Sequence, residues 1–243
     1  MNQVEVDVTV IVPVKDEEES ILPLAEDLGR AMNRQSWSWE CIWVDDGSTD
    51  RTLANLEGLA ARDAHHRYLS FERNAGQSAA LWAGFMEARG TILATIDGDG
   101  QNDPADIPRV VRLVQSGRAE MVNGYREKRQ DTFTRKISSW IANEFRNRTT
   151  GRTVRDVGCS TRAFRRECVA RLPLFAGVHR FLPTLVAMQG FKLGEVPVNH
   201  RPRVKGKSKY TIHNRLWVGL LDVLGVLWLR KRAFHYVVAK RSG

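Results

Sequence analysis

The sequence predicts an α/β fold with a mostly parallel sheet covered by helices on both faces. Short apolar runs rich in β-branched residues alternate with segments of helical periodicity from residue 8 to about residue 124, as in strand–helix–strand units. The connections between them are short, which favours right-handed crossovers between parallel strands. Two of the apolar runs end in acidic residues followed by glycine. In such sheets, ligands bind just beyond the carboxyl ends of the strands.

The elements of the first half follow from periodicity. We expect the first strand at residues 8–14, a β-branched run, and the first helix at residues 17–33, where Ile21, Leu24 and Leu28 recur at helical spacing. The same reasoning places strands at 41–44, 68–71, 91–96 and 121–123, and helices at about 50–62, at 77–88 and from Pro104 onward, since proline suits the first turn of a helix.

Beyond Gly124 the alternation ends and positive charge dominates. Basic residues gather in three groups, at 126–155, 201–209 and 230–232. The segment 133–145 repeats large apolar residues every three or four positions, with cations on the other side. This pattern predicts an amphipathic helix, which either packs on the core or lies on a membrane surface.

The last apolar run, residues 216–229, is interrupted by Asp222 and followed by Arg230-Lys231-Arg232. It is shorter than the roughly 20 apolar residues that a membrane-spanning helix needs. Trp217 and Trp228 near its ends, together with the basic flank, are typical of the headgroup region of a membrane. We therefore expect an amphipathic, interfacial C-terminal helix on a membrane surface, with a partner-binding helix as the alternative.

Composition limits the setting in which the protein works. The 243 residues, 42% of them hydrophobic, can bury a real core, either as one large α/β domain or as a domain with an appendage. A formal net charge of +9 suits an anionic partner. The three cysteines form no C-x-x-C pair, which favours a reducing compartment. The first residues lack the basic start of a signal peptide, so a cytoplasmic location is expected.

Acidic residues follow two of the predicted strands. Asp45 and Asp46 end the second, and Asp97 and Asp99 end the fourth. Alternate residues of a strand point to one face, so Asp97 and Asp99 are expected to converge, with Gln101 at the next position on that face. Oxygen ligands without nearby histidine or cysteine suit Mg²⁺ or Mn²⁺ rather than zinc. A divalent metal carrying a diphosphate fits this site.

Other kinds of site lack their sequence signatures. No G-x-G-x-x-G follows a strand, and no G-x-x-x-x-G-K-[ST] occurs, which argues against dinucleotide binding and a P-loop. None of the six histidines has metal-ligand spacing. His65 and His66 are expected to face solvent, and His179 is assigned no chemistry. Ser160 lacks a recognisable His/Asp partner set, so a hydrolase is not expected.

Several motifs together resemble the inverting family 2 glycosyltransferases, and most of all the polyprenyl-phosphate transferases of the dolichol-phosphate mannose synthase type. They span residues 8 to about 212 and are Val12-Pro13-Val14-Lys15-Asp16-Glu17, Val44-Asp45-Asp46-Gly47-Ser48-Thr49-Asp50, Arg73-Asn74-Ala75-Gly76-Gln77, Asp97-Gly98-Asp99-Gly100-Gln101 and the loop Arg203-Val204-Lys205-Gly206-Lys207-Ser208-Lys209. The resemblance implies a GT-A fold, a nucleotide-diphosphate-sugar donor, a divalent metal and a polyprenyl (undecaprenyl or dolichyl) phosphate acceptor at the cytoplasmic face of a membrane.

The resemblance also assigns residues to roles. It implies a GT-A domain at 1–212, with a nucleotide-binding half at 1–125 and an acceptor half at 126–212, before a helical tail at 213–243. The residues implied in nucleotide-sugar binding are Pro13, Lys15, Glu17, Val44, Asp45, Asp46, Asp97, Gly98, Asp99, Arg126, Arg203 and Lys209. Those implied around the metal are Asp97, Asp99 and Gln101.

A phosphate acceptor sets the mechanism. Transfer to an alcohol needs a general base, whereas a phosphate monoester is already ionised and needs only placement. The metal, Arg203 and Lys209 would then stabilise the departing nucleoside diphosphate while in-line attack inverts the anomeric centre. Asp156 is a candidate acceptor-side carboxylate, and a salt bridge to Arg155 or Arg162 is the alternative.

Three departures from the family pattern bear on these roles. The usual S-G-F-R stretch reads Cys159-Ser160-Thr161-Arg162-Ala163-Phe164, which puts its acceptor contacts in doubt. Gly100 replaces a bulkier residue in the metal loop. The paired transmembrane helices of many members are not found in this sequence, which leaves the mode of membrane attachment open.

Two other functions are weighed against this one. A family 2 transferase acting on a cell-wall, polysaccharide or other non-lipid acceptor fits most of the same motifs. A basic nucleic-acid-binding protein explains the net charge but not the acidic residues at two strand ends, so we expect no nucleic-acid partner. A homo-oligomer stays open, and so do the sugar, the base and the lipid length.

Overall fold

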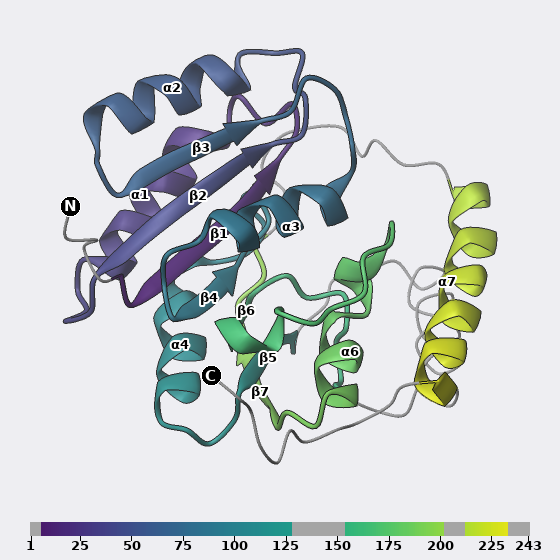
Figure 1. The fold of residues 1–243 in the computed structure, drawn as a ribbon. Coiled ribbons are helices and arrows are strands. Elements are labelled where there is room, and N and C mark those ends of the chain that lie inside the picture. The colour runs from purple at the N-terminus through teal and green to yellow at the C-terminus, as the bar shows by residue number, and fades with distance from the viewer. Residues whose placement is uncertain (1–5, 128–153, 202–211, 233–243) are drawn as a thin grey trace, which may run out of the picture.

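The computed structural model describes residues 6–127, 154–201 and 212–232, without the side chains of 212–220. One seven-stranded sheet has the strand order β3-β2-β1-β4-β6-β5-β7 (Figure 1). Only β6 runs against its neighbours β4 and β5, so the predicted, mostly parallel sheet is confirmed. The strands are β1 (Val8–Val14), β2 (Trp39–Asp45), β3 (His66–Ser70), β4 (Ile92–Thr95), β5 (Met121–Arg126), β6 (Arg162–Arg165) and β7 (Leu193–Val198).

Helices cover both faces of this sheet, as predicted. Alternate residues of β1 enter different cores: Val10 and Val12 pack into a cluster with α1, α2 and α4, and Ile11 into a cluster with α3, α6 and α7. A parallel sheet buried on both faces has this pattern. The helices are α1 (Ile21–Met32), α2 (Thr52–Arg62), α3 (Gln77–Glu87), α4 (Ile107–Gln115), α6 (Leu182–Met188) and α7 (Ile212–Arg232), with 3-10 turns at Pro104–Asp106, Arg166–Cys168 and Val178–Arg180.

The first helix begins at Ile21, four residues later than predicted. The intervening loop is held instead by the chain that follows β2. The backbone N–H of Glu17 donates to Thr52 Oγ1 at 2.8 Å, and that of Glu18 donates to Asp50 Oδ2 at 3.3 Å. These two bonds hold the loop against the start of α2, and α1 begins after it.

His66 does not face solvent, which corrects the expectation from sequence. It begins β3, lies opposite Cys41 in the parallel register and is 4% exposed. Its Nδ1 accepts a hydrogen bond of 3.0 Å from Trp43 Nε1 on β2. Strand pairing with β2 thus buries this ring, and burial lowers the pKa of His66.

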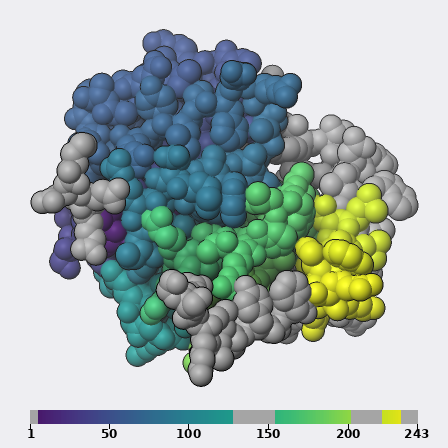
Figure 2. All heavy atoms as spheres, in the orientation of Figure 1, coloured from purple at the N-terminus to yellow at the C-terminus, as the bar shows by residue number. Residues whose placement is uncertain are grey.

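The tail helix α7 packs beside the second half of the molecule (Figure 2). Val223 and Val226 are buried in the cluster that also contains α3 and α6. Leu221, Leu224 and Trp228 lie on the other side of the helix and are exposed. None of the helices in the described ranges has the length and apolar character needed to cross a bilayer.

Candidate active site

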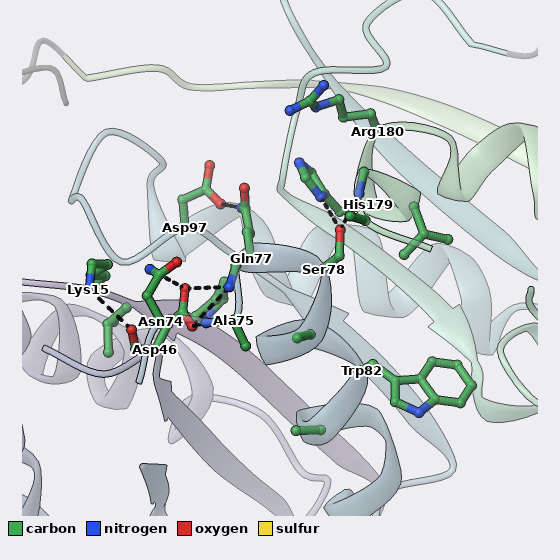
Figure 3. A pocket seen from close by; sticks show the side chains of 18 of the residues that line it. Lys15, Asp46, Asn74, Ala75, Gln77, Ser78, Trp82, Asp97, His179 and Arg180 are labelled. Carbon is green, nitrogen blue, oxygen red and sulfur yellow. Dashed lines mark hydrogen bonds between the residues drawn. The ribbon is translucent and has the colours of Figure 1, made fainter. Parts of the chain in front are cut away.

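A cavity of about 950 Å³ opens at the carboxyl ends of β1, β2 and β4. One side is formed by Pro13 near the end of β1, by Lys15 and Glu17 after β1, and by Asp46 after β2. The opposite side is formed by residues 174–180, here called the far wall, and by the start of α3 (Figure 3). The cavity therefore lies where ligands bind in open α/β sheets.

The loops after β1 and β2 are fastened to each other. Asp16 adopts a positive φ of 47°, and its Oδ1 accepts a hydrogen bond of 2.7 Å from the backbone N–H of Thr49. Its own backbone N–H donates to Ser48 Oγ at 2.8 Å. Lys15 Nζ donates to the carbonyl oxygens of Gly47 at 2.9 Å and Asp46 at 3.3 Å. These bonds hold the cation of Lys15 at the side of the cavity.

Two of the predicted nucleoside contacts lie beneath the cavity instead of lining it. Val44 is fully buried in β2, and Asp45 is 1% exposed. Asp45 accepts hydrogen bonds from the backbone N–H of Ser48 at 3.0 Å, from the Ser48 hydroxyl, and from Ser70 Oγ at 2.9 Å. Its carboxylate is thus used to hold the turn after β2 against the end of β3.

Asp46 lines the cavity and organises the loop before α3. Its carboxylate accepts hydrogen bonds from the backbone N–H groups of Ala75 at 2.6 Å and Gly76 at 3.0 Å, and from Asn74 Nδ2 at 3.0 Å. Carboxylate bonds to backbone N–H groups are charge-assisted and strong. The motif at residues 73–77 is therefore shaped by a side chain from the strand-end motif at residues 44–50.

Asp97 and Asp99 both line the cavity, as the sequence predicted, but for another reason. β4 ends at Thr95, so the two side chains meet across a turn, not along a strand. Burial and the charge of Asp99 raise the pKa of Asp97 to about 6. Gln77 Nε2 donates to Asp97 Oδ1 at 2.9 Å, and the Asp97 backbone N–H donates to Ser160 Oγ at 3.2 Å.

The donor set of this acidic turn, residues 97–99, fits a hard divalent cation. Two carboxylates line one cavity, and burial together with the charge of Asp99 raises the pKa of Asp97. Mg²⁺ typically takes one or two carboxylates and fills its other positions with water and substrate phosphates. Within the described residues no group of three His, Cys, Asp or Glu side chains gathers, so further ligands would be of another kind.

Gln101 lies next to this turn, although it is not among the residues that line the cavity. Its backbone N–H donates to Asp99 Oδ1 at 3.1 Å, and its carbonyl oxygen accepts from the backbone N–H of Arg201 at 2.7 Å. Asn102 forms a β-bridge with His200. The chain that leads into the basic loop at 203–209 is therefore bonded to Gln101 and Asn102, which follow the acidic turn.

Arg126 and Asp156, which the resemblance assigns to separate roles, form one ion pair. Arg126 Nε donates to Asp156 Oδ2 at 2.7 Å, and Nη2 donates to Oδ1 at 3.0 Å. Both side chains are 14% exposed, and neither lines the cavity. Asp156 is thus paired with Arg126 on β5, a partner that the sequence did not predict.

Arg162 is instead buried in β6 and holds the far wall. Its Nη1 donates to the carbonyl oxygen of His179 at 2.9 Å, and its Nε donates to Asn123 Oδ1 at 2.8 Å. Ser160 is bonded to the backbone of Asp97, and Arg162 to that of His179. The stretch at residues 159–164, which departs from the family pattern, therefore supports the acidic turn and the far wall. Burial lowers the pKa of Arg162.

Sequence reasoning missed the residues on the second side of the cavity. They are Gln77, Ser78, Trp82, His179 and Arg180. Gln77 ends the motif at residues 73–77, to which the sequence analysis assigned no role. That motif was the only sequence feature that pointed to this side of the cavity. Ser78 and His179 are 101 positions apart and touch only in the fold. Arg203, Lys209 and the segment 133–145 lie outside the described residues.

Residues 9–172 match the sequence profile of glycosyl transferase family 2. The chain belongs to this family. It is 40% identical over 229 residues to a dodecaprenyl-phosphate galacturonate synthase of Rhizobium johnstonii, covering 93% of this chain and 68% of that protein. It is 37% identical to an undecaprenyl-phosphate 4-deoxy-4-formamido-L-arabinose transferase of Salmonella choleraesuis, covering 84% of this chain and 62% of that protein. The chain thus spans about two thirds of these relatives' length.

Solved structures share the fold of this family 2 glycosyltransferase. Glucosyl-3-phosphoglycerate synthase from Mycobacterium tuberculosis, in complex with Mn²⁺, UDP and its product, superposes with a TM-score of 0.67 at 20% identity. The match covers 92% of this chain and 79% of that one. A second complex of that enzyme, with Mg²⁺ and UDP, also gives a TM-score of 0.67, at 19% identity. The predicted GT-A fold is therefore confirmed.

Proposed function

We propose that this family 2 glycosyltransferase moves a sugar from a nucleotide-diphosphate donor to a polyprenyl phosphate, with inversion and with a divalent metal. One observation carries the proposal. A single cavity joins the carboxylates of the acidic turn to a far wall that contains the cation of Arg180 and the exposed side chain of Leu174 but no carboxylate. The names of the relatives, which refer to dodecaprenyl and undecaprenyl phosphates, support the same acceptor class.

The donor is proposed to bind at the side formed by the loops after β1 and β2. Pro13, Lys15, Glu17 and Asp46 line this part of the cavity. Carboxylates there can accept hydrogen bonds from the N–H groups of a base or from ribose hydroxyls. Val44 and Asp45 support this surface from below. Their contribution is the shape of the loops, which a preorganised binding site requires.

Mg²⁺ or Mn²⁺ is proposed to bind at Asp97 and Asp99, with Gln101 as the predicted neighbour. When bound, such a cation neutralises charge on the departing diphosphate. Arg201 is bonded to the backbone of Gln101, and Arg203 follows two positions later. We propose that Arg203 and Lys209 add positive charge beside the same diphosphate.

The far wall favours a phosphate acceptor over a sugar hydroxyl. An alcohol would need a general base to take its proton. Burial and two neighbouring arginines lower the pKa of His179 to about 3, which makes it a weak proton acceptor. Asp156, the predicted acceptor-side carboxylate, is bonded to Arg126 away from the cavity. An acceptor that is already ionised removes the need for a base.

The tail helix supports a membrane surface as the place of action. Leu221, Leu224 and Trp228 are exposed on one side of α7, and Arg230, Lys231 and Arg232 follow them. Apolar side chains beside a cationic flank suit the headgroup region of an anionic leaflet. We propose that the segment 213–243 attaches residues 1–212 to the cytoplasmic face of a membrane.

The experiment that tests this function compares acceptors directly. The purified chain is incubated with labelled nucleotide sugars, Mn²⁺ and either undecaprenyl phosphate or a glycan acceptor. We expect label in an organic-extractable product only when the lipid is present. Chelation should abolish transfer, and Asp97→Asn or Asp99→Asn should lower kcat/KM by roughly a hundredfold or more, as expected when transition-state charge loses its counter-ion.

Glu57→Gln is the matched control, since Glu57 is an exposed carboxylate on α2 outside the cavity. It should transfer sugar like the wild type. Label that enters the glycan with equal rate would favour the alternative acceptor. Full transfer by both aspartate variants would reject the proposed metal site at Asp97 and Asp99.

A further inference from the structure

We infer that Ser78, His179 and Arg180 form an anion subsite on the far wall, braced from behind by Asp222 of the tail helix. The subsite binds an anionic oxygen group of the substrates. Two sources have this chemistry, the phosphate of the lipid acceptor and a carboxylate on the donor sugar. The inference rests on the proposed function and names the residues that would hold one end of its substrates.

A chain of hydrogen bonds orients the imidazole of His179. The backbone N–H of Gly177 donates to Ser78 Oγ at 2.9 Å, and Ser78 Oγ lies 2.7 Å from His179 Nδ1 (Figure 3). Because Ser78 Oγ already accepts the Gly177 N–H, we assign its hydroxyl hydrogen to Nδ1, which is then the acceptor in one of the two tautomers that the contact allows. This places the proton of the neutral ring on Nε2, which makes that nitrogen a hydrogen-bond donor.

The ring of His179 is bonded at Nδ1, its backbone is bonded at the carbonyl oxygen, and the ring is uncharged. Arg162 Nη1 donates to the carbonyl oxygen of His179 at 2.9 Å, which fixes the backbone. Burial, Arg180 and Arg162 keep the pKa of His179 near 3, so the imidazole is neutral at physiological pH. In this structure His179 therefore offers a neutral N–H donor whose position is fixed by Ser78 and Arg162.

Arg180 supplies the positive charge. Its side chain lines the cavity and is 38% exposed. Its Nη1 lies 3.7 Å from Asp222 Oδ2, too far for a hydrogen bond. Within the described residues that oxygen is buried and accepts no hydrogen bond. Asp222 thus attracts the guanidinium without using its N–H groups, which leaves them able to bind an anion.

The tail helix packs so closely on the far wall that only glycine fits between them. Gly177 has a φ of +100°, and a Cβ there would lie 2.6 Å from Asp222 Oδ2. Asp222 sits on α7, while Gly177 and Arg180 sit on the far wall. Asp222 is therefore a positioning residue, and α7 is part of the site as well as the proposed membrane contact.

The surroundings fit an anionic group attached to an apolar body. Leu174 on the far wall is 61% exposed, and Phe175 and Trp82 line the same side of the cavity. Isoprenoid phosphate has this combination of an anion and a hydrocarbon chain. A uronate carboxylate would use the same donors without the apolar shelf, so the two sources are separable by experiment.

Calorimetry tests the subsite without turnover. Farnesyl phosphate and farnesol differ in their charged group and serve as the lipid probes, while a nucleotide sugar with a uronate and one with a neutral hexose serve as the donor probes. If the subsite holds the lipid phosphate, Arg180→Ala and His179→Ala should weaken farnesyl phosphate about tenfold and leave farnesol unchanged. Asp222→Asn should act in the same direction but less, and Arg180→Lys should restore part of the affinity.

The nucleotide-sugar probes test the other possible ligand, a carboxylate on the donor sugar. If Arg180→Ala weakens only the uronate nucleotide sugar, the subsite holds the sugar carboxylate instead of the lipid phosphate. Arg118→Ala, at an exposed arginine outside the cavity, is the control and should change neither arm. Melting curves verify that each variant is folded.

Unchanged affinity in both arms, in folded Arg180→Ala and His179→Ala proteins, would overturn the inference. So would a wild type that binds neither anionic probe more tightly than its neutral counterpart. If the proposed function is wrong, no sugar is transferred to undecaprenyl phosphate. The calorimetric binding measurements can still be interpreted in that case.

Discussion

At the scale of single residues, desolvation decides the charge of the groups around the cavity. Burial raises the pKa of Asp97 to about 6 and lowers the pKa of His179 to about 3. Both shifts favour the neutral form. A bound cation would lower the raised pKa of Asp97 again, whereas the neutral form of His179 is the one that donates a single hydrogen bond. Burial thus prepares Asp97 for a cation and His179 for an anion, although both residues line the same cavity.

The pKa of His179 predicts how stability depends on pH. An unfolded histidine titrates near 6.5, while His179 in the folded protein titrates near 3. Between these values the unfolded state binds one more proton, so the free energy of unfolding falls as pH decreases, by up to about 1.4 kcal/mol per pH unit. Urea unfolding from about pH 7 to pH 4 should show a flatter dependence for His179→Gln than for the wild type.

The difference between the two curves is the informative quantity, since all other titrating groups are common to both proteins. Parallel curves would show that the imidazole of His179 is protonated in the folded state. That result would also remove the fixed neutral donor from the anion subsite.

At the scale of elements, the end of β1 approaches the acidic turn closely enough to exclude a side chain. A Cβ on Gly98 would lie 2.4 Å from Val14 Cγ1 and 3.1 Å from the carbonyl oxygen of Pro13. We expect Gly98→Ala to push the turn away from β1. Stability should fall by about 1–3 kcal/mol, the usual cost of overpacking, and binding of UDP with Mn²⁺ should weaken about tenfold.

The matched control is Gly58→Ala in the middle of α2, where a Cβ meets nothing within 4 Å. It should stabilise the protein by about 0.5–1 kcal/mol, because alanine favours a helix. Urea unfolding and calorimetry measure both variants. If Gly98→Ala behaved like this control, the close contact between β1 and the acidic turn would not exist.

At the scale of the whole molecule, α7 has two faces with different tasks. Val223 and Val226 join the core that α3 and α6 also build, and Asp222 reaches the far wall. The opposite face exposes Leu221, Leu224 and Trp228. A helix that is apolar on both sides is explained if the second side is buried elsewhere, and the basic flank at 230–232 points to an anionic lipid surface.

Vesicle sedimentation tests this surface. The combined variant Leu221→Ser, Leu224→Ser and Trp228→Ser should bind phosphatidylglycerol vesicles at least about tenfold more weakly than the wild type, because the apolar area that inserts is lost. High salt should weaken the wild type as well, since the basic flank contributes through charge. Met86→Ser, at an exposed apolar residue on α3, is the control. Equal binding by all three proteins would exclude α7 as the attachment surface.

The local pattern of the chain predicted most of the architecture. β1 matches its predicted bounds, and the other strands and helices of the first half lie within a few residues of theirs. The periodicity of strands and helices depends on residues that are close in the sequence, so a short window is enough to predict it. The position of Asp97 and Asp99 beyond a buried strand is local in the same sense, which is why the acidic side of the cavity was predicted.

Tertiary structure alone decided which polar residues face the cavity and which support it. Asp45 and Asp46 are adjacent in sequence, yet Asp45 is bonded beneath the surface and Asp46 lines the cavity. Arg126 and Asp156 are bonded across 30 positions, and Ser78 and His179 across 101. Burial and pairing depend on groups that are distant in the chain, and no local pattern records them. The chain itself therefore determined the sheet and its acidic strand ends, and only folding created the far wall and its link to the tail helix.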